Sequence, residues 1–377
     1  MCKAIIFTVS LIFNIAICSA MNPLEAAMNS GDELFKKNIF EEAALSYLRA
    51  AELAQDNTIA KVAALLRAGD CQLKNDPAKA KETFSQILIN QVSSEQETVA
   101  RVMIAQCFLA DGEFDSAITS TTQILNLPEI NREQLAEVYC IRGESFFRLK
   151  QFSLAIECFE KALASKALTS TQTLRIYSFM GSIYVDSNRM TPQSAHEKFV
   201  QMEKSINAKD SLAWFGVINA LTNSLQFKES NEICQQILKN TPNDVEKKYA
   251  SIYQAKNLFY LKRYDDAAKA YEKLYSQYPD LSEQEKVAIK LELAYVYMHN
   301  KKYHDALETF KQVLKFNEIT CSPRAQLMIG HCYFELKDFH NALNAFRQVT
   351  IMPTLKHQFQ IIEEAKQKIV ECEKNLK

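Results

Sequence analysis

One small residue recurs at nearly constant intervals along the chain, and this repeat limits the possible folds more than any other feature. The aligned positions hold Ala43, Ala80, Ala117, Ala155, Ala195, Ser230, Ala267, Ala306 and Ala342. The first and the last lie 299 residues apart, which is eight steps of about 37 residues each. Periods of this length are typical of arrays of helical hairpins. Because a single hairpin cannot bury its apolar faces alone, we expect nine hairpins that stack on one another.

The stretch 135–163 shows what one repeat contains. Its apolar residues lie at helical spacing in two runs with a break at residues 149–151, which predicts two helices joined by a short turn. Gly143 and Ala155 would let these two helices approach closely, while phenylalanines on both helices fill the space beside them. The repeat is therefore expected to be a tightly packed helical hairpin.

Two further positions recur in most repeats. An aromatic residue stands four positions after the repeat residue in seven of the nine, namely Tyr47, Phe84, Phe159, Phe199, Tyr271, Phe310 and Phe346. A small-residue position in the first helix holds Gly31, Gly69, Gly143, Gly181 and Gly330, and elsewhere Ala105, Ala255, Ala294 and Ile218. Glycine costs roughly 1 kcal/mol in a helix interior relative to alanine. Five glycines at one repeat position therefore predict close contact between the two helices of the same hairpin.

This pattern resembles the tetratricopeptide repeat family, in which W-x-x-L-G-x-x-Y is followed by A-x-x-x-F and then by P. Two repeats match it well, through Tyr139, Gly143, Phe146, Ala155 and Phe159 and through Gly330, Tyr333, Ala342 and Phe346. The resemblance implies an all-α fold, a right-handed superhelical solenoid of about nine hairpins over residues 21–352. It also implies a concave groove that is lined by the first helices and binds other proteins. The step of about 37 residues exceeds the 34 of the family, which indicates longer helices or connections.

Both ends of the chain depart from the repeat. Residues 1–20 combine one positive charge, an apolar run and terminal small residues, which predicts a secretory signal peptide that is cleaved after Ala20. The alternatives are a membrane anchor, for which the apolar run is short, and a bacterial lipoprotein acylated at Cys18. Residues 353–377 carry apolar residues on one helical face, which predicts a helix that caps the array. The alternative for this helix is binding of a partner.

Motifs that carry catalytic chemistry are absent from the sequence. With 7 glycines there is no phosphate-binding loop, and no G-x-S-x-G, H-E-x-x-H or C-x-x-C occurs. The 44 basic and 45 acidic residues balance, which gives no footprint for nucleic acid. We therefore expect a non-enzymatic protein without cofactor or metal, whose cysteines are buried thiols, although disulfides stay open. The rival interpretation is a protein that handles a small ligand or metal near His299, His304, His331 and His340.

The candidate binding residues occupy first-helix positions that the family geometry would turn into the groove. In the last four repeats these positions are rich in apolar and aromatic residues, which suit an extended or helical peptide with large apolar anchors. The alternative is that these side chains pack between neighbouring first helices. The candidates are Phe215, Asn219, Ile252, Lys256, Phe259, Leu291, Tyr295, Met298, Leu327, His331 and Phe334.

The expected function is that of an exported scaffold, periplasmic or secreted, that binds a protein or peptide in this groove. Cell-envelope assembly or secretion is the expected context, by analogy with exported bacterial repeat proteins. A membrane-tethered lipoprotein of the same fold is a second hypothesis, and no membrane span is expected in the mature chain. The clamp by which some members of the family hold a C-terminal carboxylate is missing, because only Lys256 and Asn219 resemble it. A chaperone-tail adaptor is therefore not expected.

Overall fold

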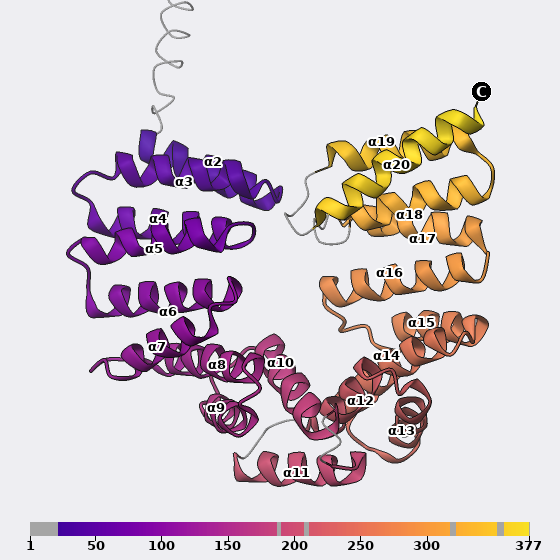
Figure 1. Ribbon diagram of the computed structural model, residues 1–377, viewed down its shortest axis with the longest axis horizontal. Helices are drawn as coiled ribbons and strands as arrows, with labels where there is room; N and C mark the ends of the chain where they lie inside the picture. The colour runs from indigo at the N-terminus through magenta and orange to yellow at the C-terminus, as the bar shows by residue number, and fades with distance from the viewer. Residues whose placement is uncertain (1–21, 187–189, 207–210, 317–321, 353–357, 377) are drawn as a thin grey trace, which may run out of the picture. The chain divides into compact units, whose positions relative to one another are not determined.

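The computed structural model describes residues 22–186, 190–206, 211–316, 322–352 and 358–376. The predicted signal peptide, with Cys18, lies outside these ranges. Within them every regular element is a helix and no strand is present (Figure 1). The prediction of an all-α fold is confirmed.

Nine helical hairpins follow one another along the described residues, as the repeat predicts, and one further helix comes after them. In each hairpin we call the two helices the first and the second helix. The pairs are α2 (Pro23–Lys36) with α3 (Phe40–Leu53), α4 (Thr58–Leu73) with α5 (Pro77–Ile89), α6 (Ser94–Ala110) with α7 (Phe114–Leu125), α8 (Arg132–Arg148) with α9 (Phe152–Ala164), α10 (Ser170–Gly181) with α11 (Pro192–Ser205), α12 (Ala213–Asn223) with α13 (Phe227–Asn240), α14 (Asp244–Tyr260) with α15 (Tyr264–Gln277), α16 (Glu283–His299) with α17 (Tyr303–Leu314), and α18 (Ser322–Glu335) with α19 (Phe339–Ile351). The last helix is α20 (Phe359–Asn375).

The chain divides into two compact units, residues 1–107 and 108–377, with the boundary inside α6. We call them the N-terminal and the C-terminal unit. In the C-terminal unit, α20 packs against both helices of the last hairpin, α18 and α19, and buries Ala365 and Cys372 there. This is the position expected of a cap. That residues 21–352 form one continuous solenoid stays a prediction.

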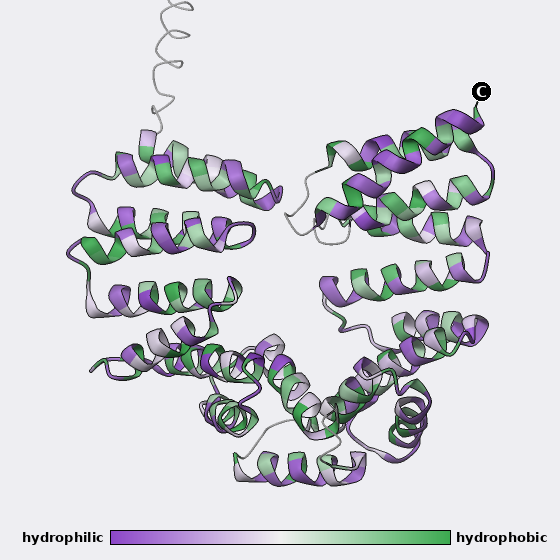
Figure 2. Ribbon diagram, viewed as in Figure 1, coloured by the Kyte–Doolittle hydropathy of each residue, from purple (hydrophilic) through white to green (hydrophobic). Residues whose placement is uncertain are grey.

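The repeat position is the most buried place in every hairpin. All nine of its residues, from Ala43 to Ala342, are 0% exposed. A β-carbon added at four of the glycines would lie only 2.3 to 2.6 Å from the ring of the repeat aromatic, and these glycines are Gly31, Gly69, Gly143 and Gly330. Figure 2 shows hydrophobic and hydrophilic residues along the same helices. The predicted close contact within the hairpin is confirmed at these four positions.

Gly181 is an exception, and the prediction for it is wrong. A β-carbon there would lie 2.1 Å from the carbonyl oxygen of Gly216, so Gly181 contacts α12 of the next hairpin. The ring of Phe199, which the repeat predicts opposite Gly181, lies against Gly216 instead. A π-helical segment, η1 (Ser182–Asp186), follows Gly181 directly. The wider turn of a π-helix takes up extra residues, which changes the register of the first helix in this hairpin.

Three residues join the two helices in most hairpins, as the break at residues 149–151 predicts. The third residue of such a connection donates its backbone N–H to the carbonyl oxygen five residues earlier. Gln151, for example, donates to Phe146 at 2.9 Å. This is the Schellman arrangement, which ends a helix sharply and returns the chain. The Schellman arrangement requires a positive φ at the second of the three connecting residues. The residues with positive φ at this place are Asn38, Gly112, Lys150, Leu225, Lys262, Lys301 and Lys337.

Two buried carboxylates hold the start of α12, which has no capping side chain of its own. Glu203 accepts a hydrogen bond from the backbone nitrogen of Leu212 at 2.7 Å, and Glu246 accepts one from that of Trp214 at 3.5 Å. The hydroxyl of Ser211 lies 2.9 Å from the first carboxylate and 3.3 Å from the second. Negative charge is favourable at a helix N-terminus. These two residues therefore connect α11 and α14 to the hairpin between them.

Replacing Glu246 by glutamine is expected to change how stability depends on pH. Burial raises the pKa of Glu246 above its ordinary value of 4.5, and the charge of Glu203 acts in the same direction. The folded protein then holds this proton more tightly than the unfolded chain, so the stability that Glu246 contributes is lost as pH rises through its raised pKa. Glutamine cannot ionise. Urea unfolding should show the variant gaining stability relative to the wild type from pH 4.5 towards neutrality, and a constant difference would contradict the prediction.

Candidate partner-binding surface

The first helices of successive hairpins form a connected layer in the C-terminal unit. Helix α8 contacts α10, α10 contacts α12, α12 contacts α14, and α14 contacts α16 (Figure 1). We call the solvent-accessible side of α8, α10, α12, α14, α16 and α18 the first-helix face. All eleven predicted binding residues lie on the first helices α12, α14, α16 and α18.

Three of the eleven predicted residues are buried in the structure. Phe215 is 6% exposed, Asn219 is 9% exposed and Leu327 is 2% exposed. The ring of Phe215 packs edge-on against Tyr249, with 4.8 Å between ring centres. The amide of Asn219 donates a hydrogen bond to the hydroxyl of Tyr253. For Phe215 and Asn219 the alternative interpretation, packing between neighbouring first helices, describes what the structure shows. Leu327 is buried with residues of α19 and α20 instead.

The other eight predicted residues are partly exposed. Their aromatic members are held at fixed positions by further rings: Phe259 contacts His299 at 5.1 Å between ring centres, and Tyr295 contacts Phe310 at 5.5 Å. Each such ring therefore presents an ordered edge or face to solvent, which is what an apolar anchor of a partner could contact. The eight residues are Ile252, Lys256, Phe259, Leu291, Tyr295, Met298, His331 and Phe334.

Two accessible side chains next to predicted residues escape prediction from the sequence. Tyr260 is 47% exposed and stacks on Phe227 with 4.5 Å between ring centres. His299 is exposed and contacts Phe259. Both follow a predicted residue directly in the chain, and a helix rotates by about 100° per residue. In each case a large side chain directly follows another, Phe259-Tyr260 and Met298-His299, and this sequence signal could have predicted the second exposed residue.

The histidines of the rival interpretation have separate surroundings. His331 places Nε2 2.9 Å from Oε1 of Glu364, whereas His299 packs on Phe259. Across the described ranges, no group of three His, Cys, Asp or Glu side chains lies close enough to hold a metal ion. In the same part of the chain, no helix combines the length and the apolar character that crossing a bilayer requires.

The described cysteines are free thiols, and most of them are buried in the helix packing. Burial raises the pKa of Cys234 to about 12, and burial raises the pKa of Cys332 to about 12. The thiolate is the reactive form of cysteine. These side chains therefore stay protonated near neutral pH and act as small apolar residues of the core. The position of Cys321 lies outside the described residues.

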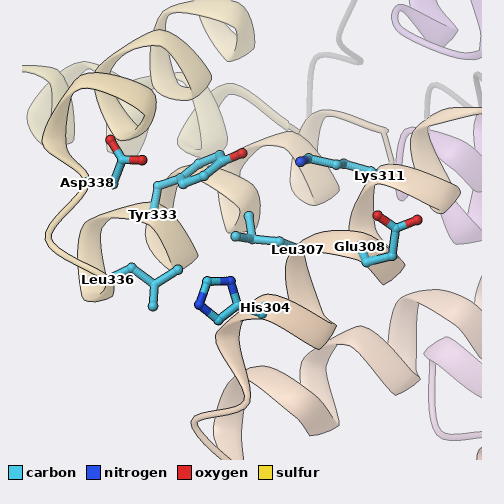
Figure 3. A pocket seen from close by; sticks show the side chains of 7 residues that line it. All are labelled: His304, Leu307, Glu308, Lys311, Tyr333, Leu336 and Asp338. Carbon is cyan, nitrogen blue, oxygen red and sulfur yellow. The ribbon is translucent and has the colours of Figure 1, made fainter.

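A pocket of about 420 Å³ opens between α17 and α18 (Figure 3). At the equivalent place between α15 and α16, Lys302 pairs with Asp265 at 2.9 Å, and Tyr297 donates a hydrogen bond to Glu272. The lining of the pocket between α17 and α18 instead contains apolar, positively charged and negatively charged side chains. This mixture favours neither an anionic nor a cationic ligand. Its lining consists of His304, Leu307, Glu308, Lys311, Tyr333, Leu336 and Asp338.

Comparison with known proteins agrees with the repeat seen in the structure. The family described as "Tetratricopeptide repeat-like domain" matches residues 28–178, and the family described as "Anaphase-promoting complex, cyclosome, subunit 3" matches residues 261–349. No curated protein matches the chain. Two similar solved structures are yeast Tom70, at 12% identity over 92% of this chain and 96% of that one with a TM-score of 0.43, and a tetratricopeptide repeat protein from Parabacteroides merdae, at 13% identity over 81% and 98% with a TM-score of 0.39.

The succession of nine helical hairpins defines the chain as an all-α helical repeat protein. The alanine, glycine and aromatic pattern inside the hairpins, together with the two family matches, makes it a member of the tetratricopeptide repeat family. Repeats of this family are generally non-enzymatic scaffolds for protein–protein interaction, which fits the absence of catalytic motifs from the sequence.

Proposed function

We propose that the protein is a non-enzymatic scaffold that binds a protein or peptide partner on the first-helix face of its C-terminal unit. The observation that supports this most is the set of eight partly exposed side chains on α14, α16 and α18, several of which are large and apolar. Phe259, Tyr295 and Met298 are the strongest candidates for direct contact, because each offers apolar area on an ordered helix. Phe215 and Asn219 act indirectly, by fixing the neighbouring first helices α12 and α14.

The mechanism follows from the packing of the repeats. The binding side chains sit on helices whose core residues are fully buried, so little conformational entropy is lost at the scaffold when a partner binds. A flexible partner segment loses its own freedom, and burial of its apolar side chains must outweigh that loss. Full burial of one large apolar side chain contributes about 1.5–3 kcal/mol. A few anchors along the layer would therefore suffice for a specific, reversible complex.

The double variant Phe259→Ala/Tyr295→Ala tests the binding surface. Loss of the two rings should weaken capture of the partner by about thirtyfold to a thousandfold, since each interface residue of this kind contributes about 1–2 kcal/mol. Affinity capture from the native cell, with the captured protein identified by mass spectrometry, measures the effect. Circular dichroism should show unchanged helix content.

The control is the double variant Leu154→Ala/Phe359→Ala, which removes two exposed apolar side chains, 44% and 61% exposed, that lie outside the first-helix face. It should capture the partner as well as the wild type does. Equal loss in both double variants, or no loss in either, would contradict the assignment of the surface. Unfolding of the Phe259→Ala/Tyr295→Ala variant would show that these rings belong to the core.

We further propose that the scaffold acts after export, in cell-envelope assembly or secretion. Support comes from the sequence of residues 1–20, whose apolar run and small residues suit a signal peptide. The intact mass of the mature protein tests this. A chain that begins at Met21 supports export by cleavage, whereas added lipid mass on Cys18 supports the tethered form, and a chain that retains residues 1–20 contradicts both.

A further inference from the structure

A buried carboxylate on α8 holds two arginines at one place on the first-helix face. The side chain of Glu144 is 7% exposed, and its two oxygens take one guanidinium each. Nη2 of Arg148 lies 3.2 Å from Oε1, and Nη2 of Arg175, on α10, lies 2.5 Å from Oε2. The two arginine side chains are 50% and 61% exposed. We call Arg148 and Arg175 the arginine pair.

The aromatic ring of Phe179 lies close to both guanidinium groups of the arginine pair. The guanidinium carbons of Arg148 and Arg175 lie 6.0 and 5.8 Å from the centre of the Phe179 ring, a distance at which cation–π attraction operates. The Phe179 ring is fixed in turn, because it packs on Phe147 at 4.8 Å and stacks on Phe159 at 5.6 Å between ring centres. Both cations are therefore held in position by an ion pair and by a ring.

The arginine pair keeps hydrogen-bonding capacity that Glu144 does not use. Neutralising the buried Glu144 needs one cation, as Glu285 elsewhere on the face is paired with Lys248 at 3.0 Å. Here two guanidinium groups share one carboxylate, so each keeps N–H donors that Glu144 does not use. Each guanidinium has five N–H donors, and its planar fork matches a carboxylate with two parallel hydrogen bonds. The nearby Glu137 accepts a hydrogen bond from the amide of Gln172 on α10.

We propose that the arginine pair binds side-chain carboxylates of an acidic segment in the protein partner. This inference rests on the proposed function, and it adds the chemistry of the partner. Helix α10 connects through α12 to α14, which carries Phe259, and neighbouring helix axes lie about 8–10 Å apart. The two steps correspond to about six residues of extended chain at ~3.3 Å per residue. The partner segment therefore has acidic residues about six positions away from its apolar anchors.

The experiment measures fluorescence anisotropy of two labelled peptides with blocked termini. The acidic peptide carries two glutamates, a spacer of about six residues and then Phe and Leu, and the matched peptide has glutamine in place of both glutamates. Wild type should bind the acidic peptide about tenfold more tightly at low salt, because charged hydrogen bonds are strong and exposed charges are screened by salt. The preference should shrink as salt is added.

The key variant is Glu144→Gln/Arg148→Gln/Arg175→Gln, which removes the whole ion-paired group and leaves no unpaired buried charge. It should bind both peptides with the affinity that the wild type has for the glutamine peptide. Arg263→Gln is the matched control: this arginine is 55% exposed and paired with Asp266 outside the first-helix face, and its loss should change neither affinity.

Absence of any preference in the wild type, or a preference that persists in the folded triple variant, overturns the assignment of the arginine pair. The proposed function fails separately. If Phe259→Ala/Tyr295→Ala weakens binding of both peptides equally while the triple variant behaves as wild type, only the acidic contact is wrong. If the acidic preference is lost in the triple variant but Phe259→Ala/Tyr295→Ala binds both peptides normally, the arginine pair stands and the apolar surface does not.

Discussion

Replacing Gly181 by alanine is expected to destabilise the C-terminal unit by about 3 kcal/mol or more, the upper part of the range for overpacked cores. The added methyl group would lie 2.1 Å from the carbonyl oxygen of Gly216 and 2.8 Å from its carbonyl carbon. These are backbone atoms of α12, so they cannot yield unless the helix itself moves. Trp214, the single tryptophan of the chain, also lies on α12 and stacks on His196 of α11 with 3.9 Å between ring centres. Its fluorescence during urea unfolding therefore follows the unfolding of α12, the helix that Gly181 contacts.

Gly143→Ala is the matched control for this prediction. Its methyl group would lie 2.6 Å from the ring of Phe159, and a side-chain ring can shift where a backbone cannot. The higher helix propensity of alanine offsets about 1 kcal/mol of the cost. The variant should therefore lose less stability than Gly181→Ala. An unfolding midpoint of Gly181→Ala equal to that of the wild type would contradict the close contact between α10 and α12.

Truncation of Phe159 to alanine is expected to cost about 3–5 kcal/mol, as for other fully buried phenylalanines. The side chain is 1% exposed, fits against Gly143 and stacks on Phe179 with parallel rings. Its removal leaves a cavity between helices that are fixed by packing on both sides. Leu154→Ala in the same helix removes a side chain that is 44% exposed, and it should cost less than about 1 kcal/mol. Urea unfolding followed by circular dichroism measures both.

The same pair offers a test of size complementarity. In the Phe159→Ala background, Gly143→Ala should cost less than in the wild type, because the cavity receives the new methyl group. A double-mutant cycle measures this coupling, which we expect to be about 1–2 kcal/mol in favour of the double variant. Strictly additive effects would contradict direct contact between the two positions.

The hairpins and their turns were predictable because the signals are local and repeated. The alanine at the repeat position, the aromatic four residues later and the break at residues 149–151 each follow from helix geometry within one repeat. Because the same pattern occurs in nine repeats, the assignment of helices and turns does not depend on any single repeat. The positions of Ala43 to Ala342 in the core therefore follow from the period alone.

The fifth and sixth hairpins differ from the prediction because a backbone irregularity lies between them. The π-helical segment after Gly181 has no counterpart in the repeat pattern, and it changes which residues face each other. The carboxylates of Glu203 and Glu246 also come from separate helices to the start of α12. Neither residue stands at a local capping position, so no motif in the sequence indicates this role.

The candidate surface was predicted only in outline. Spacing places Phe215 and Ile252 at equivalent positions, yet one is buried and the other partly exposed. The difference depends on Tyr249 and Tyr253 of the next hairpin, which cover Phe215. Likewise, the arginine pair forms only when α8 and α10 are placed side by side. Contacts between repeats are not encoded in the pattern of one repeat.

Crosslinking in the native cell tests the central claim, that a partner binds on the first-helix face. A photoreactive residue would be placed at Ile252 or Met298 on this face and, as controls, at Lys228 or Lys269, which are exposed on second helices. We expect that one partner protein is crosslinked from Ile252 and Met298 and not from the controls. Crosslinks to that partner from Lys228 and Lys269, with none from Ile252 and Met298, would contradict it.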